Sequence, residues 1–600
     1  MKKQEQFCNP VPYLDGYRRT NPDPHVIRWC GKWYCYSSDT FGRNGVKVSV
    51  SDDLVHWNEI GFCVPSEDQK HFWAPAVIYL NGVFYMYYSA VPLDSEDDHD
   101  EHLMLATATR PEGPFHWKKT FFREFSIDAH PLFWHGRMYL LYAVNNWVGT
   151  DDTVAGTCIL LDELTAPDTL AGNPKPVVLP SLPQEIFAKN RFGDGRDWFT
   201  IEGAAVLTRE DRMWLMYSAN CFLHEDYFVG TAVAEAKAAL MEMDFQKYPS
   251  PYRWDPLLKR SASTEGTGHN TVTKAPNLVD DWIVYHARRL DEPRDIEREQ
   301  REMYIDPLYF SGKSVRCPGP TSCAQPAPSM PQIRLPQKTF TEKQTLCSAP
   351  AFYTAELWIS AARQHTGVRY AVRLWEQDAG SYLELHLRSG RRTLEVIRCR
   401  AGICRTLAVI RLPVAYDYTV PHLLRVERLF GAYHICLDEQ QTVDFCDTFE
   451  ADGEVTLIPF FSELTLHSFS LTQAAVLYRT QLSYLGSFYS GAAGFAGRDG
   501  LPVADAVILP IFDDPCYTEE FQLEPAAETN ELVFLRNDRP LAALENKSSA
   551  CSVYHIVRGL QERFVLEGVQ TPWQAIDDPN KRHTLKLCNM TIISYRLTKN

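Results

Sequence analysis

A chain of 600 residues exceeds what a single hydrophobic core accommodates, so the sequence predicts several domains. Its formal net charge of −16 at pH 7 disfavours binding to nucleic acid or to an anionic membrane surface, and we expect a neutral ligand. The sequence contains no run of about eighteen apolar residues, so we expect no membrane span.

The N-terminus and the cysteines predict the compartment. The first residues, MKKQEQF, carry two lysines without an apolar stretch behind them, unlike a secretory signal. The sixteen cysteines are scattered, and neither Cys317 with Cys323 nor Cys399 with Cys404 is matched by a second pair at zinc-ligand spacing. We therefore expect reduced thiols in a cytoplasmic protein.

One local pattern recurs five times in the first half of the chain: a short strand, a polar or Gly-containing turn, then an aromatic-rich strand. This pattern is typical of a hairpin. Its spacing of roughly 50 to 75 residues leaves room for a four-stranded blade with loops, which predicts a β-propeller. The copies are NPDPHVIRWCGKWYCYSS from Asn21, WAPAVIYLNGVFYMYYSA from Trp73, IDAHPLFWHGRMYLLYA from Ile127, IEGAAVLTREDRMWLMYSA from Ile201 and GHNTVTKAPNLVDDWIVYHA from Gly268.

The residues that open the copies are candidates for chemistry. A closed ring points the start of every innermost strand at one axis, so we expect these side chains to meet at one mouth. Two carboxyl groups across a pocket can cleave a glycosidic bond, and a third can raise the pKa of the acid. For each acid alone a turn or an ion pair is the alternative, and the shared register favours a common site. The opening residues are Asp23, Trp73, Asp128, Glu202 and His269.

The rest of the chain predicts further β-structure. We expect the propeller to span residues 1–315 and a proline-rich linker to span 316–344. Regular short strands with polar turns predict a β-sandwich over 345–472, and weaker strand signals predict a second β-rich domain over 473–600. The best candidate for a short helix is 235–245. The fold class is therefore all-β, with a five-bladed propeller followed by one or two β-sandwich domains.

The motifs NPDP, WAPAV, SIDA, IEG and GHN, in this order, resemble glycoside hydrolase family 43. SDDLVHW, GPFHW and REMYIDPLYF are also similar to that family, and the resemblance covers roughly residues 10–335. It implies a five-bladed catalytic propeller that inverts anomeric configuration, with Asp23 as general base and Glu202 as general acid. Asp128 would raise the pKa of the acid and orient it. The predicted sandwich is similar to concanavalin/laminin-G-like accessory domains of β-xylosidases and arabinofuranosidases, which can lean on the propeller and close one side of the pocket.

The resemblance also implies how the mouth binds its ligands. In relatives the histidine of GHN helps to hold a cation or its waters, so Ca²⁺ near His269 is expected as an option, and a structural hydrogen bond is the alternative. Trp73 is expected to stack on a sugar, with core packing as the alternative. No other cofactor is expected. The remaining candidates for substrate contacts, of which the arginines could instead be solvated, are Phe72, Trp198, Phe199, Arg288 and Arg301.

Together these features predict an inverting, exo-acting hydrolase. It would remove terminal α-L-arabinofuranose or β-D-xylose from plant-type oligosaccharides. The alternatives are an endo-arabinanase or β-galactan-cleaving relative, a non-catalytic carbohydrate-binding propeller, and a retaining relative with a covalent nucleophile. The sequence predicts neither the oligomeric state nor the sugar.

Overall fold

The computed structural model describes residues 5–477 apart from 43, 98, 147–153, 210–211, 312–313, 365–366, 430, 448–452 and 462, and beyond them 501–503, 516–525, 531–536, 539–545, 551–558, 561–566, 569–575, 585–588 and 590–599. Its described elements are strands and two short 3-10 helices, η1 (Pro183–Glu185) and η2 (Leu240–Glu242). The prediction of a helix over 235–245 is wrong. Residue 235 is the last residue of strand β19 (Phe228–Glu235), and only the short 3-10 helix η2 follows it.

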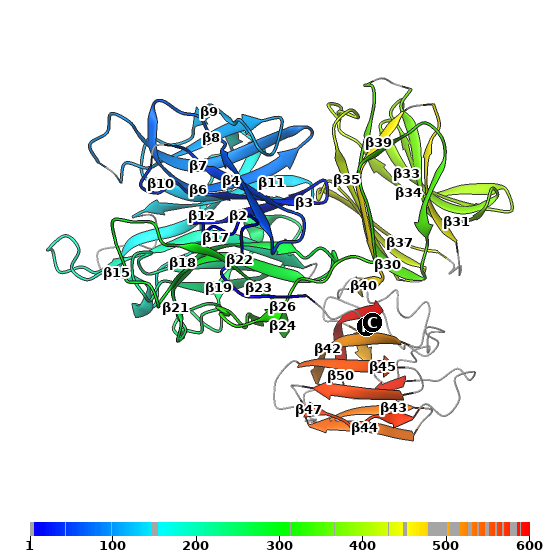
Figure 1. Cartoon of the computed structure of the whole chain (residues 1–600). Helices are drawn as coiled ribbons and strands as arrows, with labels where there is room; N and C mark the ends of the chain where they lie inside the picture. Colours follow the sequence, from blue (N-terminus) through cyan, green and yellow to red (C-terminus); the bar gives the residue numbers. More distant parts are fainter. Residues whose placement is uncertain are drawn as a thin grey trace.

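Five sheets, antiparallel apart from one short parallel pair in the third, form a ring, the blue-to-green body in Figure 1. Each sheet begins with one copy of the sequence repeat and continues outward. The first blade consists of β2 (His25–Trp29), β3 (Lys32–Ser37), β4 (Lys47–Ser51) and β5 (Trp57–Phe62). The second consists of β6 (Gln69–Leu80), β7 (Val83–Pro92), β8 (His102–Ala108) and β9 (His116–Thr120). The third consists of β10 (Ser126–Trp134), β11 (Arg137–Asn145) and β12 (Ala155–Ala166), extended by β13 (Thr169–Leu170), β14 (Lys175–Val178), β15 (Ile186–Ala188) and β16 (Trp198–Phe199).

The last two blades complete the ring. They are β17 (Ile201–Arg209), β18 (Arg212–Ala219), β19 and β20 (Gln246–Lys247), then β21 (Thr264–Lys274), β22 (Asp281–Arg289) and β23 (Glu302–Pro307). The innermost strands contact one another in cyclic order: β2 with β6, β6 with β10, β10 with β17, β17 with β21, and β21 with β2. The predicted five-bladed propeller is therefore confirmed.

The N-terminal segment closes the ring by adding to the fifth blade. The Val11 N–H donates to the Met303 carbonyl at 3.0 Å, so this segment runs beside β23. The Asn9 side chain donates to the Ile305 carbonyl at 2.9 Å and accepts the Ile305 N–H at 3.0 Å. These bonds join residues almost 300 positions apart, so the first and last blades are held together by the chain's own start.

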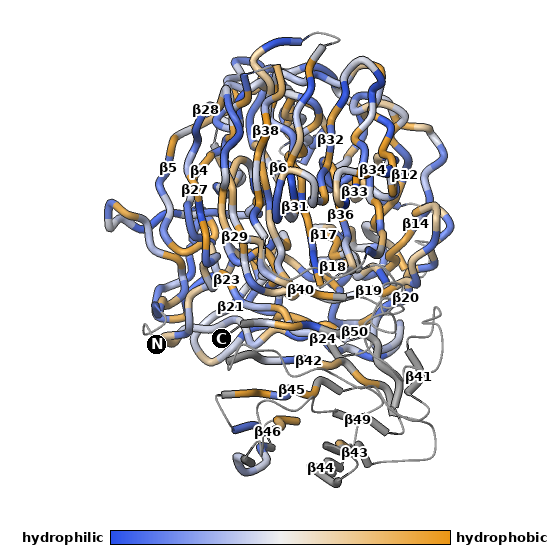
Figure 2. Tube along the Cα trace, turned by 90° about the vertical axis from the view of Figure 1, so that its right-hand side faces the viewer, coloured by the Kyte–Doolittle hydropathy of each residue, from blue (hydrophilic) through white to orange (hydrophobic). Residues whose placement is uncertain are grey.

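A β-sandwich follows the ring, with one hydrophobic core between two sheets. Figure 2 shows hydrophobic and hydrophilic stretches alternating along these strands, as expected for sheets with one buried face. One sheet contains β27 (Ile333–Leu335), β28 (Lys338–Phe340), β30 (Phe352–Ala361), β35 (His422–Leu429), β36 (Ala432–Leu437), β37 (Gln441–Cys446) and β39 (Leu464–Thr472). The other contains β29 (Gln344–Ser348), β31 (Arg369–Asp378), β32 (Ser381–Arg388), β33 (Thr393–Arg400), β34 (Ile403–Arg411) and β38 (Glu454–Pro459).

The stretch expected as a linker, 316–344, is largely structured. Near its start β24 (Tyr309–Ser311) pairs with β25 (Ser314–Arg316), and β26 (Gln325–Pro326) pairs with β1 (Gln6–Phe7). Strands β27 and β28 pair with β39, so the sandwich begins near 333 rather than at 345. Ile333 and Leu335 pack on the sandwich core, and this burial explains why a proline-rich segment joins a sheet edge.

The sandwich packs on the face of the ring that carries the turns between first and second strands (Figure 1). The Tyr79 hydroxyl donates to the Pro421 carbonyl at 2.8 Å, and the Asn81 side chain donates to the Ala415 carbonyl at 2.8 Å. Arg28 forms an ion pair with Glu356, a residue of β30. Since the inner strands run from the mouth towards these turns, the sandwich covers the face opposite the mouth.

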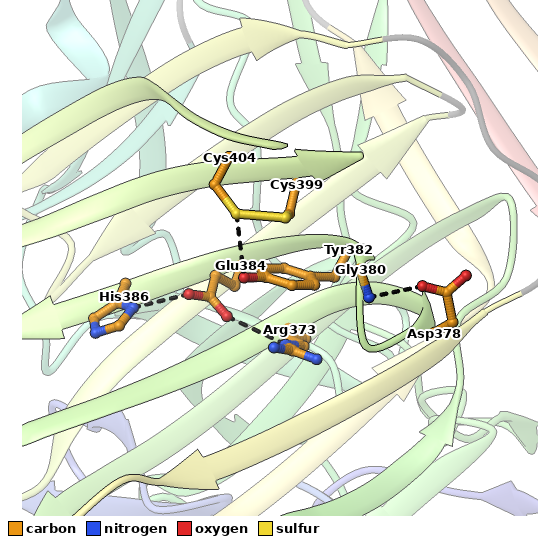
Figure 3. Close-up of a disulfide and its surroundings, with 8 residues drawn as sticks. All are labelled: Arg373, Asp378, Gly380, Tyr382, Glu384, His386, Cys399 and Cys404. Atoms are coloured by element: carbon orange, nitrogen blue, oxygen red, sulfur yellow. Dashed lines mark hydrogen bonds and ion pairs between the residues drawn. A yellow bond between two sulfur atoms is a disulfide. The ribbon is translucent and has the colours of Figure 1, made fainter. Parts of the chain in front are cut away.

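One cysteine pair differs from the expectation of reduced thiols. Cys399 and Cys404 form a disulfide, and Figure 3 shows it bridging two neighbouring strands. The two residues are directly paired across the β33–β34 hairpin, which brings their sulfurs together. The Tyr382 hydroxyl lies 3.5 Å from the Cys404 sulfur.

Strands also form the C-terminal unit, drawn orange to red in Figure 1. One sheet contains β40 (Ala474–Leu477), β41 (Leu501–Val503), β42 (Cys516–Pro525), β45 (Cys551–Arg558), β46 (Gln561–Leu566), β47 (Val569–Gln570), β48 (Gln574–Ala575) and β50 (Met590–Lys599), and a smaller one contains β43 (Glu531–Arg536), β44 (Arg539–Glu545) and β49 (Leu585–Cys588). Within the described parts of the chain, no helix has the length and apolar character needed to cross a membrane.

Candidate active site

At the mouth each innermost strand contains, or in blade one closely follows, a residue in the left-handed backbone region. In blades two to five the strand pairing is irregular at this point, which is typical of a β-bulge. Such conformations are uncommon for residues other than glycine and mark functional sites. The five residues and their φ angles are Asp23 at 53°, Ala74 at 44°, Asp128 at 59°, Gly203 at 63° and His269 at 40°.

This register corrects the sequence prediction in one respect. Asp23, Asp128 and His269 occupy equivalent positions, as expected, but Trp73 and Glu202 stand one residue earlier than their bulge residues. At the bulge itself the fourth blade has Gly203, where an added Cβ would lie 2.9 Å from the Ser218 hydroxyl. The glycine of IEG therefore lets a neighbouring strand approach the backbone.

Hydrogen bonds between neighbouring blades hold these bulges. In blade one the Ser38 hydroxyl oxygen accepts the N–H of Ala74, the bulge residue of blade two, at 2.8 Å. In blade four the Ser218 hydroxyl oxygen accepts the N–H of His269, the bulge residue of blade five, at 2.7 Å. Each serine lies near the end of its blade's second strand, one or two residues after a tyrosine. The hydrogen bond therefore recurs with the repeat.

Two further junctions replace serine with an ionisable group. The Asp128 carboxylate accepts the Gly203 N–H at 2.8 Å between blades three and four. His286 Nδ1 accepts the Asp23 N–H at 3.1 Å between blades five and one. His286 follows Tyr285 in β22, just as Ser218 follows Tyr217 in β18, so the alignment of the repeats alone indicates a junction role for His286.

A cavity of about 400 Å³ opens at this mouth. Among the described residues, every one that lines it lies between Asp23 and Arg301, within the propeller. The sandwich therefore does not close the pocket, contrary to the expectation from similar accessory domains, because it packs on the opposite face of the ring. The predicted residues that line the cavity are Asp23, Trp73, Asp128, Trp198, Glu202, His269 and Arg301.

Three predicted substrate contacts lie elsewhere. Phe72 is fully buried and stacks on Tyr88, because alternation along β6 turns it into the core between blades. Phe199 is absent from the lining, and its backbone pairs in β16. Arg288 is buried beside the cavity, where it donates to the Glu265 carboxylate at 3.2 Å and has a structural role.

Asp23 is surrounded by hydrogen-bond donors and positive charge. Arg301 donates to its carboxylate at 3.1 Å, and the Ser38 hydroxyl donates to the other oxygen at 2.6 Å. Burial alone would raise the pKa of Asp23, but the Arg301 charge holds it well below the usual range. Asp23 is therefore ionised across the pH range in which proteins function.

Glu202 has the opposite environment. Burial and the nearby Asp128 carboxylate raise the pKa of Glu202 well above its ordinary value, although the Tyr227 hydroxyl donates to Glu202 Oε1 at 2.7 Å. Burial also raises the pKa of Asp128, but the Gly203 N–H and His269 favour its ionised form. The proton that the two carboxyl groups share therefore resides mainly on Glu202.

His269 faces two of the acids. Its Nδ1 lies 3.5 Å from Asp23 Oδ1 and 3.7 Å from Asp128 Oδ2. In the part of the chain that the structure describes, no group of three or more His, Cys, Asp or Glu side chains could hold a metal ion. Ca²⁺ near His269, held directly or through its waters, stays a prediction.

Sequence reasoning missed most of the rim. The Arg191 guanidinium lies 4.7 Å from the Phe187 ring centre and 5.3 Å from that of Trp198, on the loop between β15 and β16. Residues on a loop do not follow the register of the repeat. Only the proximity of Phe187 and Arg191 to Trp198 in the sequence could have suggested them. The other lining residues are Thr40, Asp97, His99, Asp100, Phe125, Ile127, Asn145, Thr157, Phe192, Thr200, Phe222 and Tyr227.

An ionised carboxylate and a protonated carboxyl group thus line one cavity. The first can accept a proton from water, and the second can donate one to a departing oxygen. Aromatic side chains on the rim provide apolar surfaces against which sugar rings pack.

Comparisons with known proteins assign the propeller region to a family. The sequence model of "Glycosyl hydrolases family 43" matches residues 14–313, which is half of the chain. An extracellular exo-alpha-(1->5)-L-arabinofuranosidase of Streptomyces chartreusis is 29% identical over 308 residues, 47% of this chain and 84% of that protein. Alpha-L-arabinofuranosidase 43 of Humicola insolens is 25% identical over 51% of this chain and 60% of its own length.

A crystal structure of a thermostable family-43 glycoside hydrolase is 31% identical, covers 54% of this chain and 99% of its own, and has a TM-score of 0.45. The chain spans less than two thirds of the Humicola enzyme, and the matches to both relatives cover about half of the chain. Since the family model matches half of the chain and the catalytic propeller is present, the chain belongs to glycosyl hydrolase family 43 and is a glycoside hydrolase.

Proposed function

We propose that the protein is an inverting, exo-acting hydrolase that releases a terminal pentose, α-L-arabinofuranose or β-D-xylose, from neutral oligosaccharides. The observation that carries the proposal is the opposite ionisation of two acids in one cavity: the pKa of Asp23 is lowered and that of Glu202 is raised. The relatives named as arabinofuranosidases support the choice of sugar, and "Putative beta-xylosidase" of Xylanibacter ruminicola, 37% identical over 16% of the chain, keeps xylose open.

In the proposed reaction Asp23 removes a proton from water as the water attacks the anomeric carbon. Glu202 gives its proton to the leaving oxygen, and the glycosidic bond breaks with inversion. Asp128 keeps Glu202 protonated through its charge and fixes the Glu202 backbone through the Gly203 N–H. Each step uses residues already in place and returns the enzyme once protons exchange with solvent.

The experiment is a panel of aryl arabinofuranosides, xylopyranosides and galactopyranosides, assayed with the parent protein and with Glu202→Gln. We expect release from one pentoside and a fall of about 10²–10⁴-fold in the variant on substrates with poor leaving groups. Binding without turnover by the parent would instead indicate a sugar-binding propeller. Residence in the cytoplasm stays a prediction that cell fractionation can test.

A further inference from the structure

The second strand of blade five carries a histidine where three other copies of the repeat carry serine. Those serines are Ser38, Ser89 and Ser218, and the last two directly follow a tyrosine, as His286 follows Tyr285. A serine would suffice for the bond to the next blade, as Ser218 shows with the His269 N–H at 2.7 Å. The imidazole of His286 therefore supplies something beyond that hydrogen bond.

The ring of His286 lies flat against Tyr227. The two ring centres are 5.9 Å apart and their planes differ by 2°. Burial lowers the pKa of His286 to about 4, so the imidazole is neutral, and its Nδ1 accepts the Asp23 N–H. Burial also raises the pKa of Tyr227 well above its ordinary value, so its hydroxyl keeps its proton and donates to Glu202.

Gly268 makes room for this arrangement. A Cβ at that position would lie 1.9 Å from Tyr227 Cε1, so any side chain larger than hydrogen would displace the ring. The Thr267 hydroxyl donates to the Tyr227 carbonyl at 3.3 Å and fixes the backbone there. The glycine of the GHN motif thus positions a tyrosine, and through it the acid.

We propose that Tyr227 and His286 are a stacked pair of positioning residues that connects the general base to the general acid. His286 holds the backbone of Asp23, Tyr227 holds Oε1 of Glu202, and their contact sets the relative placement of the two carboxyl groups. With Oε1 occupied as an acceptor, the transferable proton is placed on Oε2. The inference rests on the proposed function, because it assigns Asp23 and Glu202 the roles given there.

Tyr227→Phe keeps the ring and the stack but removes the donor. The charged and titratable groups that act on Glu202 are Asp128, Asp23, Arg301 and Tyr227, with Cys221 nearby. Because the hydroxyl favours ionised Glu202, its loss raises the pKa of the acid, and the alkaline limb of kcat/KM moves to higher pH. Because the proton is then misplaced, kcat falls by roughly tenfold or more on phenyl glycosides and much less on dinitrophenyl glycosides, which leave with little protonation.

His286→Ser restores the residue of the repeat. It keeps an acceptor for the Asp23 N–H and removes the ring behind Tyr227. If the stack connects the two carboxyl groups, this substitution impairs proton donation by the general acid although it lies beside the general base. The loss of kcat then grows as the leaving group becomes poorer. The double variant with Tyr227→Phe then shows the leaving-group dependence of Tyr227→Phe alone, because the ring acts only through the tyrosine hydroxyl.

The measurement is kcat, KM and the pH profile for phenyl, nitrophenyl and dinitrophenyl glycosides, with thermal unfolding of each variant as a check on folding. His286→Asn, which retains an acceptor with more volume, replaces His286→Ser if that variant unfolds. Equal losses on all substrates, or a Tyr227→Phe enzyme with the parent pH profile, would overturn the inference. An inactive parent, or a Glu202→Gln variant without leaving-group dependence, would instead overturn the proposed function.

Discussion

The two faces of the propeller differ although the same hairpins build both. At the mouth the inner strands begin with left-handed bulge residues, two of them acids, and inter-blade hydrogen bonds fix these residues. At the other face the turns of the same hairpins contact the sandwich through Tyr79, Asn81 and the Arg28–Glu356 ion pair. Chemistry and domain packing therefore occupy opposite ends of the inner strands, and a change at one end should leave the other intact.

The largest expected effect is a loss of kcat from a substitution at the mouth. Asp23→Asn removes the ionised base, and kcat should fall by about 10²–10⁴-fold on every aryl glycoside, whatever its leaving group. The variant retains the shape of the side chain, so thermal unfolding should change little. Steady-state kinetics with a set of leaving groups checks this, and a loss confined to poor leaving groups would assign Asp23 to the wrong step.

The pH dependence of activity tests the ionisation states of the acids at the mouth. Activity requires ionised Asp23 and protonated Glu202, so it persists at mildly acidic pH and is lost as rising pH deprotonates Glu202. Asp128→Asn removes a negative charge that raises the pKa of Glu202, so the alkaline limb of kcat/KM should move to lower pH. If the limb stays in place, burial alone sets the pKa of the acid.

The packing face predicts a change in stability without a change in chemistry. Glu356 is buried and contacts Arg28 and Arg425, the latter at 2.8 Å. Glu356→Ala leaves two largely buried arginines without this partner and should lower the free energy of unfolding by about 3–5 kcal/mol. The folded variant should keep the parent kcat.

The matched control is Glu163→Ala, which removes an exposed ion pair with Arg137 at 3.3 Å. It should cost about 1 kcal/mol or less. Chemical denaturation with kinetics on the folded fraction measures both. A lower kcat for Glu356→Ala at temperatures where it is fully folded would mean that the sandwich does influence the mouth.

An effect smaller than that of Glu356→Ala is expected at the disulfide. Cys399 and Cys404 close a short loop in a hairpin whose strands are already paired, so Cys404→Ser should cost at most about 2 kcal/mol of unfolding free energy. No change in kcat or KM is expected. Denaturation with and without reductant, followed by an activity assay, tests this, and loss of activity on reduction would contradict it.

The sequence predicted the ring and the meeting of Asp23, Asp128 and Glu202 in one cavity because the repeat has a regular period and its opening residues carry charge. It placed Trp73 and Glu202 at the same register as Asp23 because a bulge adds a residue without altering the local pattern. The burial of Phe72 follows from the alternation of side chains along its strand, so Phe72 could have been excluded as a substrate contact. Tyr227 lies outside any repeat, and its role depends on contacts between blades that no local pattern contains.

The sandwich illustrates the same limit. Its alternating strands were recognisable, but which face of the ring it covers depends on contacts such as that of Arg28 with Glu356, more than 300 residues apart. Likewise, the pairing of Cys399 with Cys404 depends on the register of one hairpin, which spacing alone did not distinguish from two free thiols.

The most direct test of the central claim, that Asp23 activates water while Glu202 donates a proton, is time-resolved proton NMR of the first sugar released. Attack by water predicts that this sugar has the anomeric configuration opposite to that of the substrate, before mutarotation. Release of the same anomer as in the substrate would contradict the account, because it requires a covalent intermediate on one of the acids.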